Sequence, residues 1–202
     1  MKTPKDIFEL LGIPSYACPR HHVGQYSGDL LLVGGGRTLW EDTRGLPHPS
    51  NTMCVNDVGM YWPGKVTHWY SNDVDQLIHW CQGRRRPYKY YGGHGHLHTC
   101  TPRSGPDYKG VTFWPFPTQG SSGIVALYVA LAMGYDQITV VGMPWDDDGH
   151  FFDPPTGHSL SEGRSWTNFT TETPEIYLKR LLPLCIGRVR AVSGRLKTLL
   201  EG

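Results

Sequence analysis

Residues 120–142 read GSSGIVALYVALAMGYDQITVVG, in which two serines flanked by glycines open a long apolar segment. The apolar run over 124–134 is long enough for a helix and closes on a glycine. Residues 138–142 follow it as a short run rich in β-branched side chains, which predicts a buried strand. The stretch therefore predicts a helix that begins on Ser and Gly and leads into a strand.

A second glycine motif lies earlier in the chain, where LLLVGGG over 30–36 predicts a strand that runs into three glycines. Glycine lets backbone N–H groups approach a ligand, and a helix start offers unpaired donors and a positive dipole end to an anion. Both devices together predict a bound phosphorylated nucleotide, with Gly34, Gly35 and Gly36 at one motif and Gly120, Ser121, Ser122 and Gly123 at the other. Three glycines in a row also form ordinary tight turns, so for the first motif both interpretations stay open.

Helices and strands alternate through the rest of the chain. Further helices are expected over 4–12, 38–45, 73–81, 175–184 and 194–200, and further strands over 52–55, 66–70, 111–114 and 189–192. This order predicts an α/β fold, Rossmann-like, with a mostly parallel sheet and helices on both faces. A chain of 202 residues suits a single nucleotide-binding domain over 1–202.

Residues 83–110 show no hydrophobic period and are rich in Gly and Pro, which predicts one long irregular insertion. We expect this insertion to form a lid that carries the basic run 84–86 and the histidines of 94–98. His94, His96 and His98 share a parity with Cys100 that would suit zinc in an extended segment, but the intervening glycines argue against a strand. Arginines beside Tyr88, Tyr90 and Tyr91 are also compatible with nucleic-acid binding, although a solvated surface loop is the simpler interpretation.

Short polar side chains follow two of the predicted strands. They are Asn56 and Asp57 after the first, and Ser71, Asn72 and Asp73 after the second. In a parallel α/β sheet, ligands bind beyond the carboxyl ends of the strands, so these residues are candidates for contact with ribose or base. The alternative is helix capping, which the sequence favours for Asp73.

An acidic turn follows the strand over 138–142. Asp146 and Asp148 could hold a Mg²⁺ that bridges phosphates, and Asp146 or His150 could act as a general base toward an acceptor hydroxyl. A solvated acidic turn is the structural alternative.

The bulk properties exclude several classes of protein. The formal net charge of +1 gives no general attraction to nucleic acid or an anionic membrane. Five scattered cysteines without a paired spacing do not form a disulfide framework, and they indicate reduced thiols in the cytoplasm. The N-terminal residues lack the apolar segment of a secretory signal, and no run approaches the roughly 20 apolar residues of a membrane helix.

The order of these motifs resembles two related groups, the bacterial family 42 sialyltransferases and the archaeal-type 6-hydroxymethylpterin pyrophosphokinase-like proteins. The most specific part of the resemblance is Ser121 to Gly142, with its serine–glycine start, apolar helix, AMGYDQI segment and strand. The looser match covers 28–150. The chain departs from the sialyltransferases at 34–36, where they typically carry Gly-Asn-Gly.

The resemblance implies a nucleotide-binding α/β domain whose Gly34–Gly36 turn, Asn56, Ser122 and Gly123 contact the nucleotide. The expected function is a nucleotide-dependent transferase, glycosyltransferase-like, with a nucleotide-sugar donor and a hydroxyl acceptor. A Mg²⁺-dependent pyrophosphokinase, a non-catalytic nucleotide-binding protein and a nucleic-acid-modifying transferase are the alternatives. The sequence names neither donor nor acceptor, and it leaves the oligomeric state open.

Overall fold

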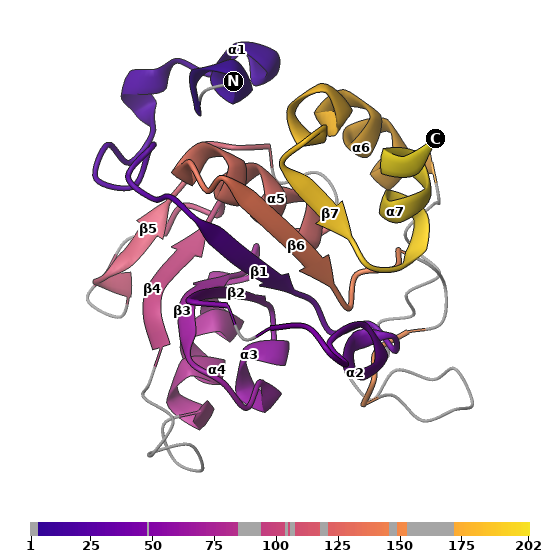
Figure 1. Ribbon diagram of the computed structural model, residues 1–202. Helices are drawn as coiled ribbons and strands as arrows, with labels where there is room; N and C mark the ends of the chain where they lie inside the picture. The colour runs from indigo at the N-terminus through magenta and orange to yellow at the C-terminus, as the bar shows by residue number, and fades with distance from the viewer. Residues whose placement is uncertain are drawn as a thin grey trace.

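A computed structural model describes residues 4–47, 49–84, 94–103, 105, 108–117, 121–145, 149–152 and 172–202. Seven strands form one sheet in the order β5-β4-β3-β2-β1-β6-β7, and every pairing in it is parallel (Figure 1). The strands are β1 (Asp29–Val33), β2 (Asn51–Val55), β3 (Val66–Tyr70), β4 (His94–Thr99), β5 (Val111–Phe113), β6 (Gln137–Val141) and β7 (Val189–Ala191). The predicted parallel α/β fold is therefore confirmed.

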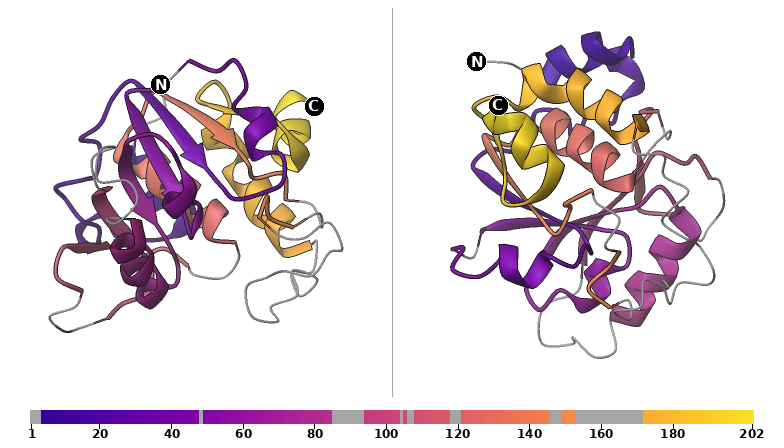
Figure 2. Two further views of the ribbon diagram at one scale, coloured as in Figure 1. Left: turned by 90° about the horizontal axis from the view of Figure 1, so that it is seen from below. Right: turned by 90° about the vertical axis from the view of Figure 1, so that its right-hand side faces the viewer.

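Helices cover both faces of this sheet, which is seen between them in the right-hand view of Figure 2. One face carries α1 (Pro4–Leu11), α5 (Ser122–Met133), α6 (Glu172–Cys185) and α7 (Gly194–Glu201). The other face carries α2 (Leu39–Asp42), α3 (Val58–Tyr61) and α4 (Val74–Arg84). A 3₁₀ turn, η1 (Ser15–Ala17), follows α1. Within the described segments, no helix is long and apolar enough to cross a membrane.

The central strand β1 shows why its sequence is apolar without interruption. Leu30 and Leu32 face the core under α5, whereas Leu31 and Val33 face the core under α3 and α4. Both faces of the strand are buried, so both sets of alternating side chains must be apolar. The same holds for α5, where every residue from Gly123 to Met133 is buried between the sheet and the outer helices α1 and α6.

The order in which the chain adds strands to the sheet changes direction at β1. From β1 the chain runs outward to β5, and it then returns to the other side of β1 to form β6 and β7. In open parallel sheets, ligands bind in the crevice outside the carboxyl ends of the two strands that flank such a reversal. Here those strands are β1, which ends at Val33, and β6, which ends at Val141.

The expectation of one irregular insertion over 83–110 is wrong where the structure describes that segment. Residues 94–99 form β4 and pair with β3 through His68↔His96 and Tyr70↔His98. Gly95 does not break the strand, because a Cβ there would lie 2.0 Å from the Thr67 carbonyl oxygen. Close contact with β3 therefore requires this glycine. Residues 85–93 lie outside the described residues.

Candidate functional site at the carboxyl edge of the sheet

The side chain of Met143 lies between the two glycine motifs. A Cβ on Gly34 would be 2.3 Å from Met143 Cγ, and a Cβ on Gly123 would be 2.8 Å from Met143 Sδ. The turn after β1 and the start of α5 are far apart in sequence, yet both contact this one residue after β6. The two motifs therefore meet at one place in the fold. Met143 follows the predicted strand over 138–142, but no pattern in the sequence predicted that its side chain would lie between the two motifs.

The first glycine motif is filled mainly by the protein's own chain. Gly34 N donates to Val141 O at 2.9 Å, and Gly36 N donates to Gly142 O at 2.7 Å. A Cβ on Gly36 would lie 2.5 Å from Pro144 Cδ. Gly34 and Gly36 therefore allow the turn after β1 to pack closely against the segment that follows β6. The tight-turn interpretation accounts for Gly34 and Gly36. Among the described residues, only the Gly35 N–H of this turn has no hydrogen-bond partner.

The second motif is an open helix start. Ser121 is the N-cap of α5, and its Oγ accepts from Gly123 N at 3.2 Å. Trp145 Nε1 also lies 3.4 Å from Ser121 Oγ, which ties the β6 connection to the cap. Ser122 is partly exposed, and its N–H has no partner within the described part of the chain. Ser122 and Gly123 are thus at a helix N-terminus as predicted; Gly120 lies outside the described residues.

Asn56 and Ser71 are brought together at the ends of β2 and β3. Ser71 Oγ donates to Asn56 Oδ1 at 2.9 Å, and Asn56 adopts a left-handed backbone with φ 57°. Its amide Nδ2 has no partner among the described residues. Trp145, with φ 51°, is the other non-glycine residue of the described chain with positive φ. Such backbone conformations are costly and cluster at functional sites, and both of these lie at the carboxyl edge.

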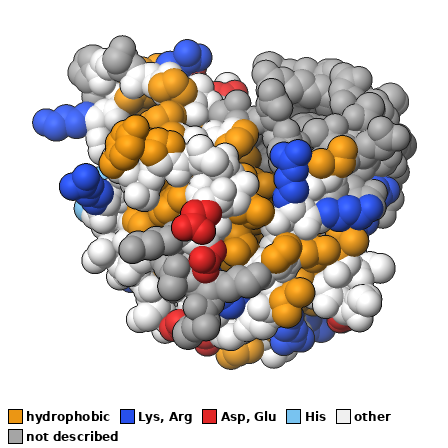
Figure 3. All heavy atoms as spheres, turned by 90° about the horizontal axis from the view of Figure 1, so that it is seen from above, with side chains coloured by type: hydrophobic (Ala, Val, Ile, Leu, Met, Phe, Trp, Pro, Cys, Tyr) orange, Lys and Arg blue, Asp and Glu red, His pale blue; other side chains and the backbone are white. Residues whose placement is uncertain are grey.

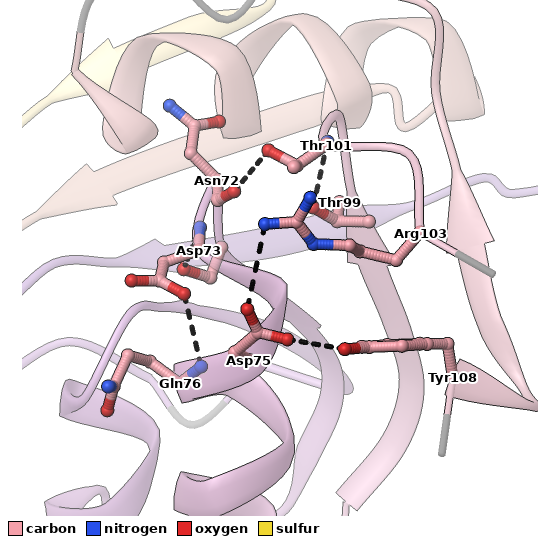
Figure 4. Close-up of polar contacts among 9 residues, drawn as sticks. Asn72, Asp73, Asp75, Gln76, Thr99, Thr101, Arg103 and Tyr108 are labelled. Carbon is pink, nitrogen blue, oxygen red and sulfur yellow. Dashed lines mark hydrogen bonds and ion pairs between the residues drawn. The ribbon is translucent and has the colours of Figure 1, made fainter. Parts of the chain in front are cut away.

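Asp73 is a helix cap, as the sequence favoured. Its Oδ1 accepts from Gln76 N at 3.2 Å in the first turn of α4, and its own N–H donates to Ser71 Oγ at 3.0 Å. Tyr70 OH donates to Asn72 Oδ1 and orients that amide. Figure 4 shows the Asn72 side chain pointing away from Asp73. Asn72 is therefore the better of the two candidates for ligand contact.

A neighbouring polar cluster of Asp75, Arg103 and Tyr108 joins α4 to the loop after β4 (Figure 4). Tyr108 OH donates to Asp75 Oδ1 at 2.6 Å, and Arg103 Nη2 lies 3.7 Å from Asp75 Oδ2. Both charged side chains are about half exposed, at 52% and 54%, so the ion pair adds little stability. This cluster holds the loop and is not a candidate for chemistry.

Two acidic residues, Asp57 before α3 and Asp42 at the end of α2, differ in their hydrogen bonds. Asp57 precedes α3, a short helix that the sequence did not predict, and it makes no side-chain cap. Asp42 is buried, and its Oδ2 accepts from Gly142 N and Ser193 Oγ, each at 2.8 Å. Asp42 therefore fixes the start of the connection that carries Met143. The sequence offered no signal for this role, because Asp42 sits in a short polar segment.

His150 lies beside the glycine turn. It pairs with Gly36 in an isolated antiparallel bridge, and a Cβ on Gly35 would lie 3.2 Å from His150 Cδ2. This places an imidazole beside the first glycine motif; the role of His150 as a general base stays a prediction. Asp146 and Asp148 lie outside the described residues, so their predicted metal and catalytic roles stay predictions.

Of the β4 histidines, His98 belongs to a buried network, whereas His94 is partly exposed and His96 is exposed; all three lie in a regular strand and not in an irregular lid. Trp114 Nε1 donates to His98 Nδ1 at 3.2 Å, His98 Nε2 lies 3.1 Å from His68 Nδ1, and His68 Nε2 lies 2.8 Å from Tyr135 OH. The Trp114 donor fixes the direction of this chain, so neutral His98 and His68 each carry their proton on Nε2. His22 joins from the segment after η1, through Tyr26 OH at 2.8 Å and Thr112 Oγ1 at 3.2 Å.

Burial lowers the pKa of each of the three histidines in this histidine network, because the charged form loses its hydration. The pKa of His68 falls to about 3 and that of His22 to about 4, while the pKa of His98 lies well below its usual value. Among the residues that the structure describes, no group of three or more His, Cys, Asp or Glu is placed to hold a metal. Burial also raises the pKa of the Cys100 thiol to about 12, so this side chain is a poor thiolate ligand.

Arg84 is a further correction to the predicted lid. Its side chain is buried and donates to the Gly59, Trp62 and Gly64 carbonyl oxygens, where it holds the α3 segment against α4. It is therefore not part of a basic surface for nucleic acid. Arg85, Arg86, Tyr88, Tyr90 and Tyr91 lie outside the described residues.

No protein-family model matches the chain, and no curated protein matches it either. Solved structures do match. Sialyltransferase CstII from Campylobacter jejuni, in complex with the substrate analogue cytidine-5'-monophosphate, has a TM-score of 0.57 at 14% identity, over 82% of this chain and 79% of that chain. The monofunctional alpha-2,3-sialyltransferase Cst-I of the same organism has a TM-score of 0.57 at 14% identity, over 82% and 75%.

A third match is CST-II in complex with a trisaccharide acceptor and CMP, with a TM-score of 0.55 at 13% identity, over 81% of this chain and 80% of that chain. The chain shares the fold of these sialyltransferases. The resemblance to the sialyltransferases is thereby supported at the level of the fold. The pyrophosphokinase side of the resemblance stays a prediction.

Proposed function

We propose that this protein is a nucleotide-dependent glycosyltransferase that moves a sugar from a nucleotide-sugar donor to a hydroxyl group. The observation that carries the proposal is the meeting of the Gly34 turn and the α5 start across Met143, at the reversal point of the sheet. The fold likeness to sialyltransferases solved with CMP supports a cytidine nucleotide as the first ligand to test.

In this proposal the donor phosphate binds at the start of α5. The Ser122 N–H and the positive end of a 12-residue helix favour an anion there. The Gly35 N–H supplies a second donor across Met143. The Asn56 Nδ2 group, held in place by Ser71, contacts the base or ribose.

The chemistry requires removal of one proton. The acceptor oxygen forms a bond to the anomeric carbon of the donor sugar, the bond from that carbon to the phosphate oxygen breaks, and the nucleotide leaves with the bonding electrons. His150, beside Gly35, takes the proton of the acceptor hydroxyl. Asp146 is the alternative base from the sequence.

A second part of the proposal is that Asp146 and Asp148 bind a divalent metal ion. If Mg²⁺ bridges the donor phosphates, chelator abolishes turnover and Mg²⁺ or Mn²⁺ restores it. Turnover that is indifferent to chelator removes the metal role and leaves a proton-transfer role alone. Release of AMP from ATP in place of a sugar transfer would identify the pyrophosphokinase alternative, and nucleotide binding without turnover would identify the non-catalytic one.

Cellular location is a smaller part of the proposal. The five cysteines are buried thiols. Reduced thiols are typical of the cytoplasm, which supports a cytoplasmic enzyme.

The sharpest test is Ser122→Asp. A carboxylate in the first turn stabilises a helix but repels a phosphate at the same N-terminus. We expect unchanged or slightly higher thermal stability and at least a tenfold loss of CMP affinity, while the neutral control Ser122→Asn stays within about threefold. A thermal-shift titration measures both, because CMP at about 100 times its Kd adds 2.7 kcal/mol of stability. Equal CMP affinity in both variants would contradict the proposed phosphate site.

A further inference from the structure

Four aromatic side chains gather at the carboxyl edge on the side of α2 and α3. They are Trp40 in α2, Tyr61 at the end of α3, and Phe151 and Phe152 after β6; we refer to them as the aromatic patch. Trp40 is 44% exposed and Tyr61 is 41% exposed, whereas the two phenylalanines are partly buried. Single exposed rings are ordinary on a protein surface, whereas a contiguous apolar patch points to an interaction or ligand-binding site.

The rings of the aromatic patch form a continuous surface. The Phe151 ring lies between the two exposed rings, with its centroid 5.3 Å from that of Trp40 and 5.5 Å from that of Tyr61. Phe152 stacks against Tyr61 at 5.5 Å. Buried Trp62 supports Trp40 from below in a nearly parallel stack, 6.4 Å between centroids. The two exposed rings are thus held in fixed orientations.

The aromatic patch is joined directly to the proposed transfer site. Phe151 N donates to Gly35 O at 2.9 Å. This hydrogen bond attaches the aromatic patch to the same turn that borders the proposed donor site. The Phe152 ring lies 4.8 Å from the His150 ring. His150 in turn contacts Gly35. The candidate base therefore sits between the donor turn and the patch.

We propose that the aromatic patch binds a saccharide and forms the acceptor side of the transfer site, an inference that rests on the proposed function. One face of a pyranose ring presents C–H groups, which are attracted to the negative face of an aromatic ring, while its hydroxyls stay at the rim. Trp40 and Tyr61 offer such faces, and Trp and Tyr combine an apolar body with a polar tip. A sugar stacked on them places its hydroxyls toward His150.

Other exposed hydrophobic side chains do not form a comparable surface. The exposed rings of Tyr16 and Phe113 lie in separate elements, η1 and β5, and neither has a ring contact within the described residues. On the side of α1 and α6, Figure 3 shows hydrophobic side chains interrupted by charged ones. Leu10, Ile176 and Ile186 are exposed aliphatic residues of these helices or their ends. Aliphatic side chains provide no flat π-face for a sugar, so Ile186, at 72% exposure, is a matched control for loss of an exposed apolar side chain.

The test uses the full chain and the double variant Trp40→Ala/Tyr61→Ala, with Trp40→Phe as the conservative variant and Ile186→Ala as the control. Saturation-transfer NMR is recorded with lactose and with the methyl glycosides of glucose, galactose, mannose, fucose, N-acetylglucosamine, N-acetylgalactosamine and sialic acid. CMP affinity is measured on the same samples. We expect ring C–H signals from at least one saccharide in the wild-type protein. Its Kd rises at least tenfold in the double variant, less than threefold in Trp40→Phe, and not at all in Ile186→Ala.

The outcomes separate this inference from the proposed function. CMP binding that stays within twofold in the double variant, together with lost saccharide binding, supports the acceptor site. Absence of CMP binding in the wild-type protein removes the proposed function, while patch-dependent saccharide binding would still support the saccharide site. No saccharide signal from any member of the panel, or a signal that the double variant leaves unchanged, overturns the inference. A wild-type dimer in sedimentation that becomes a monomer in the double variant, again without saccharide binding, assigns the patch to contact between copies.

Discussion

Polar residues gather in two regions of the same sheet, and their hydrogen-bonding groups are used in opposite ways. In the histidine network, all six ring nitrogens of His22, His68 and His98 have partners, and the rings are buried. At the carboxyl edge, Asn56 Nδ2 and the Ser122 and Gly35 N–H groups have no partner within the described residues.

This difference separates structural from functional polar groups. A buried polar group must be paired within the protein, because an unpaired one costs the full desolvation penalty. Asn56 and Ser122 are partly exposed, so their unpaired donors are available to a ligand, whereas Gly35 is buried and its unpaired N–H is an exception to this pairing rule within the described residues. The sequence suggested the reverse for His98, which was expected in a ligand-dependent lid together with His94 and His96.

Acidification should break the histidine network first. The pKa of each of its three histidines is lower in the folded protein than the usual 6.5, so below about pH 6.5 the unfolded chain takes up protons that the folded chain does not. The stabilisation is complete above pH 6.5 and is lost as the pH falls toward 4. Each histidine contributes a slope of about 1.4 kcal/mol per pH unit. Denaturant unfolding at pH 7.5, 6 and 5 measures this loss.

The exposed histidine His79 on α4 supplies the control, because His79→Gln should leave the slope unchanged. The variant His68→Phe removes one of the three buried histidines. The free energy of unfolding should then depend less steeply on pH below pH 6.5, even if its value at pH 7.5 also changes. A free energy of unfolding that is constant from pH 7.5 to 5 would show that these rings are not buried as neutral groups.

Within the first glycine motif, Gly34→Ala should destabilise the fold far more than Gly35→Ala. The new Cβ at Gly34 would lie 2.6 Å from the Gly142 carbonyl oxygen and 2.3 Å from Met143 Cγ. Because backbone cannot move aside, we expect a loss of about 3 kcal/mol in the free energy of unfolding. At Gly35 the nearest atom is His150 Cδ2 at 3.2 Å, and we expect less than about 1 kcal/mol. Urea unfolding of both variants tests the difference; equal losses would refute the assignment of Gly34 to packing.

At the carboxyl edge, Asn56→Gly should weaken nucleotide binding with little effect on stability. Glycine keeps the left-handed backbone of this position and removes only the amide, so CMP affinity should fall by about 1–3 kcal/mol. Asn51→Ala, at the amino end of the same strand, is the matched control and should leave the affinity unchanged. Calorimetric titration with CMP measures the Kd of both variants. An unchanged Kd in Asn56→Gly would show that Asn56 has a structural role and does not contact the nucleotide.

Most of the fold follows from local patterns in the sequence. Alternation of apolar runs with helical segments predicted the parallel sheet, because strands buried on both faces must be apolar throughout and strands joined by helices run parallel. The positions of Ser122 and Gly123 at the start of α5 and the cap at Asp73 were also predicted, since capping depends on side chains within a few residues of the helix start. Local chemistry was sufficient for all of these.

Which polar residues face one another depends on how the elements pack in three dimensions. Strand β4 was not predicted because its histidines and glycine have no strand propensity. Its position depends on pairing with β3 and on the hydrogen bonds of His98 to His68 and Trp114. Asp42 gained its role from Gly142 and Ser193, which lie 100 and 151 residues away in the sequence. Met143 gained its role from the turn after β1 and the start of α5. The aromatic patch likewise joins Trp40, Tyr61 and Phe151 from three separate connections. Contacts of this kind depend on how strand ends are arranged in space, which no local pattern in the sequence encodes.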